Sequence, residues 1–468
     1  MKKVYIKRAI LPGIIFSVTL SSCNITKQYK TPEVSTENMF RDTSLSDTTT
    51  IADIPWKEYF KDPILRTLID ECLNNNYDLK IAEARMRQAG ANLSIAKAAY
   101  YPTVALAGQV NQTRSSKNGN ALRDHANVYT LGIATTWELD IWGKLNRQSK
   151  AKYAQLLSSQ EYRNLVQTNL VAGVATSYYT LLSLDEQLKI SNEAITLLRK
   201  MVVTTESLRD AGLQNTAAVE QMKATLYSTE VSIPELECSI REMENTICVM
   251  LGKKPGPVTR NSFTDQIIPT NMKMGLPVHM LANRPDVKGA ELDFRAAFEL
   301  AVAAQASLYP SITLGSSSDA NMIGYTSTTL SNFFKPENIF ANILGGLTQP
   351  LFAGNQLRAN IKIQKASQEI ALYTFEKTVL TASQEVSDIL YTYKSSFRKN
   401  EKRSQQITAL KNSVEYTQLL LEAGEANYIE VITAEQNLLE AQLGQVKDKL
   451  EQLQAGIDLY KALGGGIK

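Results

Sequence analysis

Apolar residues recur at intervals of three and four along much of the chain, and proline and glycine are nearly absent from two long stretches. From Lys144 to Ala211 there is a single glycine and no proline, and from Asn355 to Ala423 neither residue occurs. At a rise of 1.5 Å per residue, each stretch predicts a helix of about 100 Å. The apolar seams are typical of coiled-coil packing and consist of Leu181, Leu184, Leu188, Ser191, Ile195, Leu198 and Val202, and of Leu439, Leu443, Val446, Leu450, Leu453, Ile457 and Tyr460.

Four short segments follow a different pattern, in which apolar residues alternate with polar or small ones as in a β-strand. In each half of the chain a proline, Pro102 or Pro310, ends an alanine-rich helical stretch just before the first segment. Polar stretches, 113–126 and 319–336, separate the two segments of each pair. We therefore predict one β-hairpin per half, with helix–strand junctions at Pro102, Pro310 and Pro350. The alternating positions of the four segments are Val104, Leu106 and Gly108; Tyr129, Leu131 and Ile133; Ile312, Leu314 and Ser316; and Ile339, Ala341 and Ile343.

Gly212 and Gly424 follow the two long helical stretches, at positions where glycine commonly ends a helix. Beyond each glycine the chain is expected to turn back as a helix of about half the length. The predicted return helices span about 215–251 and 427–463, and shorter helices span 65–101 and 276–309. The segment 252–275 and the segment 23–62 are expected at mid-height of the helices.

The chain contains an internal repeat. Residues 78–106 align without a gap to residues 286–314, and the residues in common are Asp78, Lys80, Ala82, Glu83, Arg87, Tyr101 and Pro102, which match Asp286, Lys288, Ala290, Glu291, Arg295, Tyr309 and Pro310. Further matches occur in the same order down to Leu251-Gly252 and Leu463-Gly464. We therefore divide the chain into a first repeat, 63–275, and a second repeat, 276–468.

The N-terminus has the pattern of an export signal, in which basic residues precede an apolar stretch from Ala9 to Leu20 that is too short to span a bilayer. Leu20-Ser21-Ser22-Cys23 resembles the bacterial lipobox, in which the cysteine thiol accepts a diacylglycerol. Residues 1–22 are therefore expected to be removed, and Cys23 to become the lipidated N-terminus of the segment 23–62.

Composition gives no indication of catalysis or of nucleic-acid binding. The formal net charge of +3 falls to about −1 when the four basic residues of the signal are removed, so a basic surface for nucleic acid is not expected. His125 and His279 lack partners at a metal-ligand or nucleophile spacing, and no phosphate-binding glycine motif occurs. We expect no cofactor beyond the acyl groups on Cys23, no metal site, and packing roles for Cys72, Cys238 and Cys248.

Four strands are too few for a membrane barrel, and a bilayer does not tolerate an open sheet edge. Three chains would supply twelve strands and a ring of helices around a water-filled bore. The predicted fold is therefore mainly helical, with a long coiled-coil helical barrel and four strands per chain that close as a 12-stranded β-barrel in a trimer. A coiled-coil protein without a membrane barrel is the plainer alternative, but it leaves the lipobox and the two proline–strand junctions unexplained.

Four segments of the chain resemble the signature motifs of the TolC-like outer-membrane efflux family, in particular of its lipid-anchored NodT-type branch. They are Trp137-Glu138-Leu139-Asp140-Ile141-Trp142-Gly143, Leu276-Pro277 with Asn283-Arg284-Pro285-Asp286-Val287, Leu347-Thr348-Gln349-Pro350-Leu351-Phe352 with Gly354, and Tyr460-Lys461-Ala462-Leu463-Gly464-Gly465-Gly466. The resemblance runs from about Trp56 to the C-terminus. It implies a homotrimeric channel in the outer membrane of a Gram-negative bacterium, with its helical barrel in the periplasm, a periplasmic adaptor protein, and an inner-membrane pump of the resistance-nodulation-division type.

The resemblance also implies a gate at the periplasmic helix tips, where carboxylates just beyond the second reversal line the constriction. Glu430 stands at such a position, and Thr433 lies where some members of the family carry a second acid. Three copies of Glu430 would favour cations in a narrow bore, although a simple surface role stays open. Candidates for adaptor docking or tip-to-tip contacts are Gly212, Gly424, Glu206, Arg209, Asp210, Glu422 and Glu425.

The function expected from these features is the passage of small molecules from the periplasm or a pump to the outside. An exit duct for secreted polypeptides shares the architecture but usually lacks a lipobox. A coiled-coil adaptor lipoprotein would carry one helical hairpin flanked by β-rich domains, and a lipoprotein enzyme fits least well. The cargo, whether drugs, toxic compounds or metals, cannot be read from the sequence.

Overall fold

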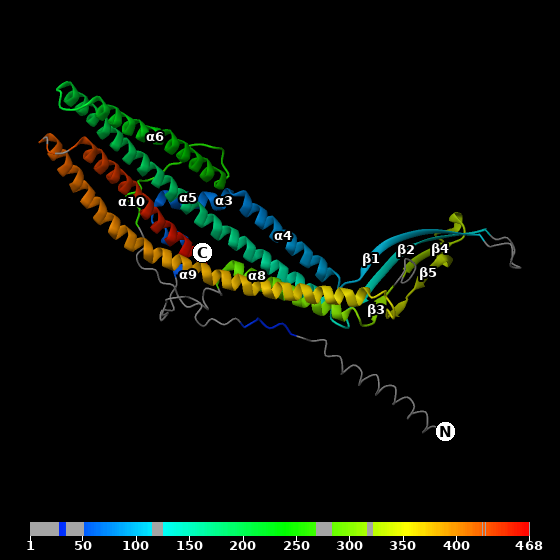
Figure 1. Ribbon diagram of the computed structural model, residues 1–468. Coiled ribbons are helices and arrows are strands. Elements are labelled where there is room, and N and C mark those ends of the chain that lie inside the picture. Colours follow the sequence, from blue (N-terminus) through cyan, green and yellow to red (C-terminus); the bar gives the residue numbers. More distant parts are fainter. Residues whose placement is uncertain are drawn as a thin grey trace. The chain divides into compact units, whose positions relative to one another are not determined.

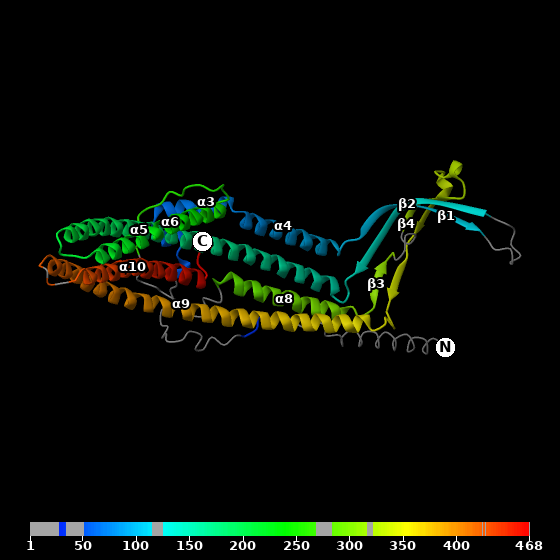
Figure 2. The same cartoon turned by 45° about the horizontal axis from the view of Figure 1, so that its top comes forward.

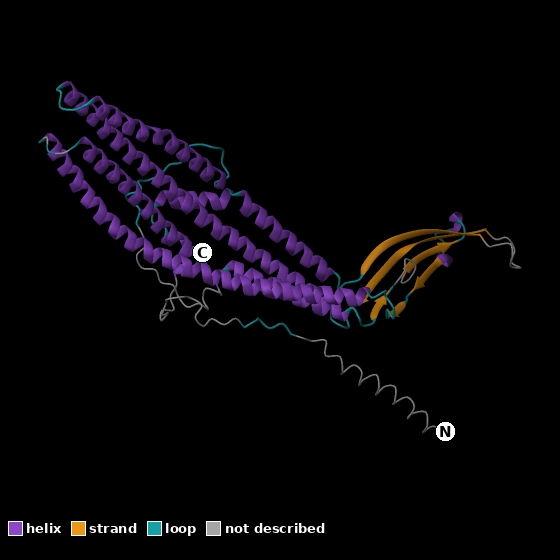
Figure 3. Ribbon diagram, viewed as in Figure 1, coloured by secondary structure: helices purple, strands orange, loops and turns teal. Residues whose placement is uncertain are grey.

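The computed structural model of the chain is mainly helical, with one β-sheet (Figures 1 and 3). It describes residues 28–33, 51–114, 125–267, 283–315, 322–423, 425 and 427–467. The signal 1–22, Cys23 and Gly424 lie outside these residues. The described helices are α2 (Trp56–Tyr59), α3 (Pro63–Asn75), α4 (Tyr77–Ala98), α5 (Lys144–Asp210), α6 (Thr216–Met250), α8 (Pro285–Ala306), α9 (Gln356–Glu422) and α10 (Tyr428–Ala462), with the 3-10 turns η1 (Ile51–Asp53), η2 (Leu330–Asn332) and η3 (Pro336–Asn338).

The long helices have the extents that the sequence predicts. Helices α5 and α9 each contain 67 residues, and the return helices α6 and α10 each contain 35. Helix α6 continues through Pro234. These four bounds agree with the predicted ranges to within a few residues, because long stretches without helix breakers determine them locally.

The predicted helix over 65–101 is instead two helices, α3 and α4, separated at Asn76. Asn76 has an extended backbone (ψ 134°), and its side-chain oxygen accepts hydrogen bonds from the amides of Asp78 (2.8 Å) and Leu79 (3.2 Å). The Asn76 amide group donates to the carbonyl of Met250 (2.9 Å). A capping asparagine therefore starts a new helix at a point where the sequence carries neither proline nor glycine.

The described residues fall into two compact units. The first draws on residues 28–33, 85–114, 125–159, 289–315 and 322–375. The second draws on residues 51–84, 160–267, 283–288, 376–423, 425 and 427–467. Each unit takes segments from both halves of the chain. This spatial division therefore differs from the predicted repeats 63–275 and 276–468, each of which contributes to both units.

The sheet belongs to the first unit and is antiparallel throughout. Strand β2 is central: it pairs with β1 along twelve residue pairs on one side and with β3 and β4 on the other. Strand β5 then extends the sheet beyond β4, and β6 extends it beyond β3. The strands are β1 (Thr103–Arg114), β2 (His125–Leu139), β3 (Ser311–Leu314), β4 (Met322–Ser327), β5 (Ile339–Asn342) and β6 (Gly345–Thr348).

The predicted hairpin of the second half is correct in outline but wrong in its connection. Both β3 and β4 pair antiparallel with β2, at successive positions along it, so both strands run in the same direction. The predicted connection, 319–336, therefore contains strand β4, and the chain turns only after Ser327. The described residues accordingly form six strand segments instead of four. Pairing with β2, and not local alternation, decides this register.

The core of the second unit lies along the predicted seams. Leu181, Leu453 and Ile457 are buried, and Tyr178 is fully enclosed. Cys72 and Cys248 are buried, as expected of packing residues, but Cys238 is exposed on α6, so the packing role predicted for it is wrong. No helix among the described residues is both long and apolar enough to cross a membrane.

Candidate functional site

The helix reversals of the second unit bring together most of the residues that the sequence singles out. Helices α5 and α6 form one antiparallel hairpin and α9 and α10 another (Figures 1 and 2). The turn from α5 to α6 and the turn from α9 to α10 therefore both lie in the second unit. The geometry of each turn follows from its residues.

Gly212 makes the first reversal. Its φ of 74° is in the left-handed region, which costs other residues about 1–2 kcal/mol. After it, the amide of Leu213 donates to the carbonyl of Leu208 (2.9 Å). The side chain of Asn215 then caps α6 by accepting a hydrogen bond from the amide of Ala218 (2.9 Å). A glycine stop and an asparagine start thus define a tight turn with an exposed tip, on which Leu213 faces solvent.

The second reversal repeats this arrangement where it is described. The amide of Glu425 donates to the carbonyl of Leu420 (2.9 Å), which is the same spacing as between Leu213 and Leu208. Asn427 caps α10 through the amide of Ile429 (3.3 Å). Gly424 and the side chain of Glu422 lie outside the described residues.

The charged candidates at the first reversal are paired within their own hairpin. The guanidinium of Arg209 contacts the carboxylate of Asp210 (2.7 Å), and that hydrogen bond raises the pKa of Arg209. Glu206 on α5 pairs with Lys223 on α6 (2.9 Å). All of these groups are at the surface, where such pairs contribute little stability and stay available to a partner.

Glu430 lies in the first turn of α10 and is exposed. Its carboxylate has no hydrogen-bond or ion-pair partner among the described residues. The helix N-terminus favours a negative charge at this place. One turn on, the hydroxyl of Thr433 donates to the carbonyl of Ile429 (2.8 Å), so its hydroxyl hydrogen is engaged by its own helix. Glu430 is therefore a free carboxylate next to a reversal, as a gate residue would require.

An apolar cluster joins the two hairpins just behind their tips. It takes residues from α5, α6 and α10, with Leu421 of α9 packed against it, and consists of Ile195, Leu198, Val202, Ala218, Met222, Leu226, Tyr428 and Ile432. The first turn of α10, which carries Glu430, is therefore held against the first hairpin through Tyr428 and Ile432. Any movement of this turn must repack the cluster.

Glu435 is a residue that sequence reasoning missed. Its carboxylate accepts a hydrogen bond from the Gln418 amide (3.1 Å). Burial raises the pKa of Glu435 above its ordinary value of 4.5. It borders a cavity of about 170 Å³ that Glu193, Thr225 and Thr229 also line. No motif marks this position, because its burial depends on helices that are distant in the sequence.

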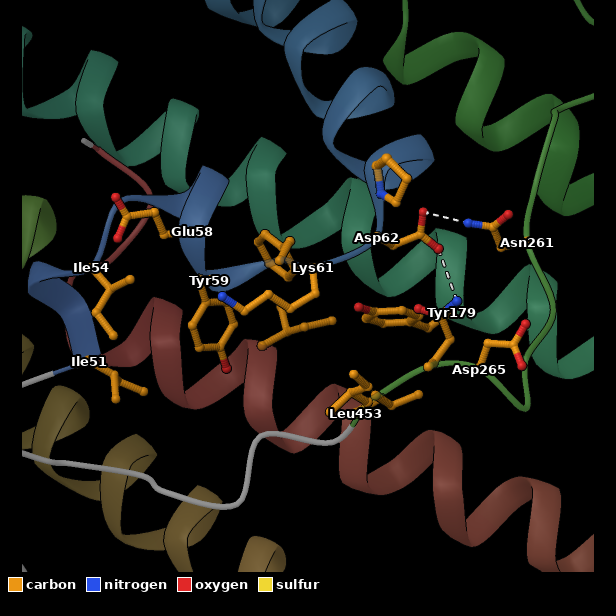
Figure 4. A pocket seen from close by; sticks show the side chains of 15 residues that line it. Ile51, Ile54, Glu58, Tyr59, Lys61, Asp62, Tyr179, Asn261, Asp265 and Leu453 are labelled. Carbon is orange, nitrogen blue, oxygen red and sulfur yellow. Dashed lines mark hydrogen bonds between the residues drawn. The ribbon is translucent and has the colours of Figure 1, made fainter.

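A second cavity of the same unit, of about 640 Å³, lies beside Tyr59, Tyr179 and Leu453 (Figure 4). Asp62 stands at its edge and accepts hydrogen bonds from Tyr178, Asn261 and Gln266, each at 2.9 Å. Burial raises the pKa of Asp62, but these hydrogen bonds outweigh burial and hold it below its ordinary value. The network ties the start of α3 to α5 and to the segment after α6.

The predicted helix–strand junctions lie in the first unit. The indole nitrogen of Trp142 donates to the carbonyl of Pro310 (2.6 Å), and its ring stacks on Tyr309 with centroids 5.1 Å apart. Pro102 directly precedes β1, as predicted. Pro350 lies between the end of β6 and the start of α9, and Leu351 and Phe352 beyond it are almost fully exposed.

Within the described residues, no group of three or more histidine, cysteine or acidic side chains is placed to hold a metal ion. His279 and the side chain of His125 lie outside these residues.

Comparison with known proteins gives a consistent result. The family model described as outer membrane efflux protein matches residues 68–253 and again residues 276–465. The probable outer membrane lipoprotein SilC of Salmonella typhimurium is 28% identical over 415 residues, which cover 88% of each chain. The cation efflux system protein CusC of Escherichia coli O6:H1 is 28% identical over 469 residues, which cover 98% of each chain.

Solved structures share the fold. The outer-membrane channel OprN superposes with a TM-score of 0.88 at 23% identity, covering 95% of this chain and 100% of that one. The open state of the MtrE outer membrane channel of Neisseria gonorrhoeae superposes with a TM-score of 0.84 at 24% identity, covering 95% and 99%.

Proposed function

Because the chain belongs to the outer membrane efflux protein family, we propose that three copies of it form the exit channel of a tripartite efflux system. The protein is an outer-membrane efflux channel of a Gram-negative bacterium. The trimer, the lipid on Cys23, the gate and the adaptor contacts are the proposed parts. The observation that carries the proposal is the pair of matched repeats, each with its own helix reversal and its own strands.

The sheet supports a barrel shared between copies. Among the described residues, β1 pairs only with β2, while β5 and β6 pair only with β4 and β3. Neither edge of the described sheet is therefore paired with a further described strand, and a bilayer does not tolerate an open sheet edge. Alternate residues of β1, Val104, Leu106 and Val110, are exposed and apolar, as on a lipid-facing strand.

The helix reversals would form the periplasmic end of the channel. We place the contacts with a periplasmic adaptor protein at Gly212 and Gly424 and at the surrounding charges Glu206, Arg209, Asp210, Glu422 and Glu425. The paired surface charges of the first hairpin suit exchange with the charges of a partner. Energy for transport would come from an inner-membrane pump, and an adaptor would shift the packing of the tips from a closed to an open state.

Glu430 would line the constriction in three copies. Its exposure, its lack of a partner among the described residues and its place next to the second reversal support this role. Opening would require repacking of the apolar cluster that holds Tyr428 and Ile432 against the first hairpin.

The cargo is proposed only as small molecules. Relatives carry names for cation efflux and for toluene efflux at the same 28% identity, so similarity does not distinguish between them. Selection among cargoes would then reside mainly in the pump.

The test of the gate is single-channel conductance of the purified protein in planar bilayers. Glu430→Gln should reduce cation-over-anion selectivity and block by divalent cations by several-fold, because a ring of three charges is removed. Glu440→Gln, on an exposed position of the same helix, serves as the matched control and should behave like the unaltered protein. Equal selectivity of the two variants would exclude Glu430 from the constriction.

A further inference from the structure

A short segment near the N-terminus, residues 28–33, is fastened to helix α8 within the first unit (drawn in blue in Figure 1). The hydroxyls of Tyr29 and Thr31 both donate to the same carboxylate oxygen of Glu291, at 3.3 and 2.8 Å. Hydrogen bonds to a charged acceptor are about twice as strong as neutral ones. A single acid on α8 therefore holds two side chains of the segment.

The ring of Tyr29 also contacts α8. Its centroid lies 5.8 Å from that of Phe294 and 5.8 Å from that of Phe298. The guanidinium of Arg295 lies 5.6 Å from the ring centre, in cation–π range. Burial and the charge of Glu291 raise the pKa of Tyr29 to about 12.

This binding site distinguishes α8 from the corresponding helix of the other repeat. Glu291 and Arg295 have their counterparts in Glu83 and Arg87 of α4, so the charged residues belong to the repeat as a whole. The two phenylalanines do not, because Met86 and Gly90 occupy the positions that match Phe294 and Phe298. Helix α4 thus lacks the two aromatic side chains, which indicates that those on α8 serve a contact specific to α8.

The contacts also fix the direction of the segment. Tyr29 packs against Phe294 and Phe298, whereas Thr31 reaches only Glu291, nearer the start of α8. Residues 29–31 therefore run antiparallel to α8, so that Tyr29 lies nearer than Thr31 to the end of α8 that leads to strand β3. The aromatic pair Trp142 and Tyr309 lies at that end, as side chains at a membrane interface do.

The reach of the chain matches this distance. From Phe294 or Phe298 to Ala306, at the end of α8, the helix rises by about 12–18 Å. Five residues lie between Cys23 and Tyr29, and the six Cα-to-Cα steps of an extended chain span at most about 20 Å. An acyl group on Cys23 can therefore reach the membrane level at the helix–strand junction, but only if the chain between Cys23 and Tyr29 is almost fully extended.

We infer that Glu291, Phe294, Arg295 and Phe298 form a docking site for Tyr29 that fastens the lipidated N-terminus and sets the height of the channel against the membrane. The inference rests on the proposed lipidation of Cys23. Tyr29 acts as a positioning residue, and it joins the first unit to the outer membrane by a second route besides the strands.

The docking itself is tested by limited trypsin digestion of the purified, full-length protein, with cleavage after Lys30 followed by mass spectrometry. Tyr29→Ala should speed this cleavage about tenfold, because the loss of the aromatic and hydrogen-bond contacts allows the segment to detach. Gln28→Ala, an exposed neighbour, is the control and should leave the rate unchanged. Equal rates for both variants would overturn the docking site.

The role in positioning is tested by shortening the chain between the lipid and the docking site. Deletion of residues 25–27 removes about 10 Å of reach, and it should lower the amount of heat-dissociable trimer in the outer membrane about threefold or more. Adding Tyr29→Ala to the deletion should restore the trimer, because the undocked segment gives back the missing length. A purely structural role of Tyr29 predicts the opposite, a double variant worse than either single one, and that result would overturn the inference.

Acylation is measured separately, by the mass of the N-terminal peptide. If Cys23 carries no lipid, the proposed anchor fails, the deletion should have no effect, and protection against trypsin still reports the docking. If Cys23 is lipidated but the deletion is harmless, the anchor stands and the inference about height is wrong.

Discussion

The carboxyl group of Glu435 is favoured in its charged form by water in the unfolded chain and in its protonated form by burial among the helices of the folded protein. Burial raises its pKa above 4.5, so the folded protein binds this proton more tightly than the unfolded chain does. The resulting penalty on folding is present at neutral pH and disappears as the pH falls through the raised pKa. Glu193 lines the same cavity.

Glu435→Gln should therefore stabilise the protein at pH 7.5 and not at pH 4. The gain should stay below about 1 kcal/mol, because water still reaches the carboxylate and screens it. Thermal unfolding followed by circular dichroism at both pH values measures it, with Glu440→Gln as the exposed control. A gain that is the same at both pH values would show that amide packing, and not the removal of a charge, is the cause.

Residues of this kind were not predictable from the sequence. Glu435 and the network around Asp62 acquire their properties from partners up to 204 positions away. Tyr29 meets Glu291 across 262 positions. In the sequence, that contact is reflected only in a difference between the repeats, where Phe294 and Phe298 stand in place of Met86 and Gly90. This difference can be interpreted only once Tyr29 is known to pack against the two phenylalanines.

At the scale of elements, strands β2 and β4 face each other at a pair of glycines. Gly132 and Gly324 are register partners. A Cβ atom on Gly324 would lie only 2.4 Å from the Cα of Gly132 and 2.2 Å from the carbonyl oxygen of Leu131, which are backbone atoms that cannot rotate away. The sheet at this point is possible only without side chains.

Gly324→Ala should consequently separate β4 from β2 and cost about 1–3 kcal/mol, the usual range for overpacking. Gly108→Ala in β1 is the matched control, because its added Cβ would meet the Leu131 side chain at an ordinary 3.5 Å. The measurement is the fraction of protein that migrates as a folded, heat-modifiable species on a gel. If Gly324→Ala assembles as fully as Gly108→Ala, the close approach of the two strands is wrong.

Elements were predictable where local rules determine them. The lengths of α5 and α9 follow from stretches without proline and almost without glycine. The end of α5 follows from Gly212, and the starts of α6 and α10 follow from Asn215 and Asn427, which need no distant partner. The break at Asn76 and strand β4 were missed. Asn76 caps a helix in the middle of a continuous helical pattern, and β4 is a strand because β2 lies beside it.

At the scale of the whole molecule, a single chain leaves the two edges of its described sheet without a partner strand. Strand β1 on one edge of the described sheet, and β5 and β6 on the other, have no further strand to pair with. Exposed edges in lipid cost several kcal/mol for each unpaired group. Edges from neighbouring copies are the natural partners, since a symmetric ring gives every copy the same two contacts.

We therefore expect light scattering of the detergent-extracted protein, with the detergent contribution subtracted, to give about three times the mass of one chain, whose full length is 51.9 kDa. Heating in detergent should convert this species to single chains, because the strand pairs between copies are then lost. The heated sample is the internal control for the single-chain mass. A stable species with the mass of one chain before heating would leave both sheet edges open in the membrane. In that case neither a shared channel nor a ring of three Glu430 carboxylates could form, and transport would have to follow a path within a single chain.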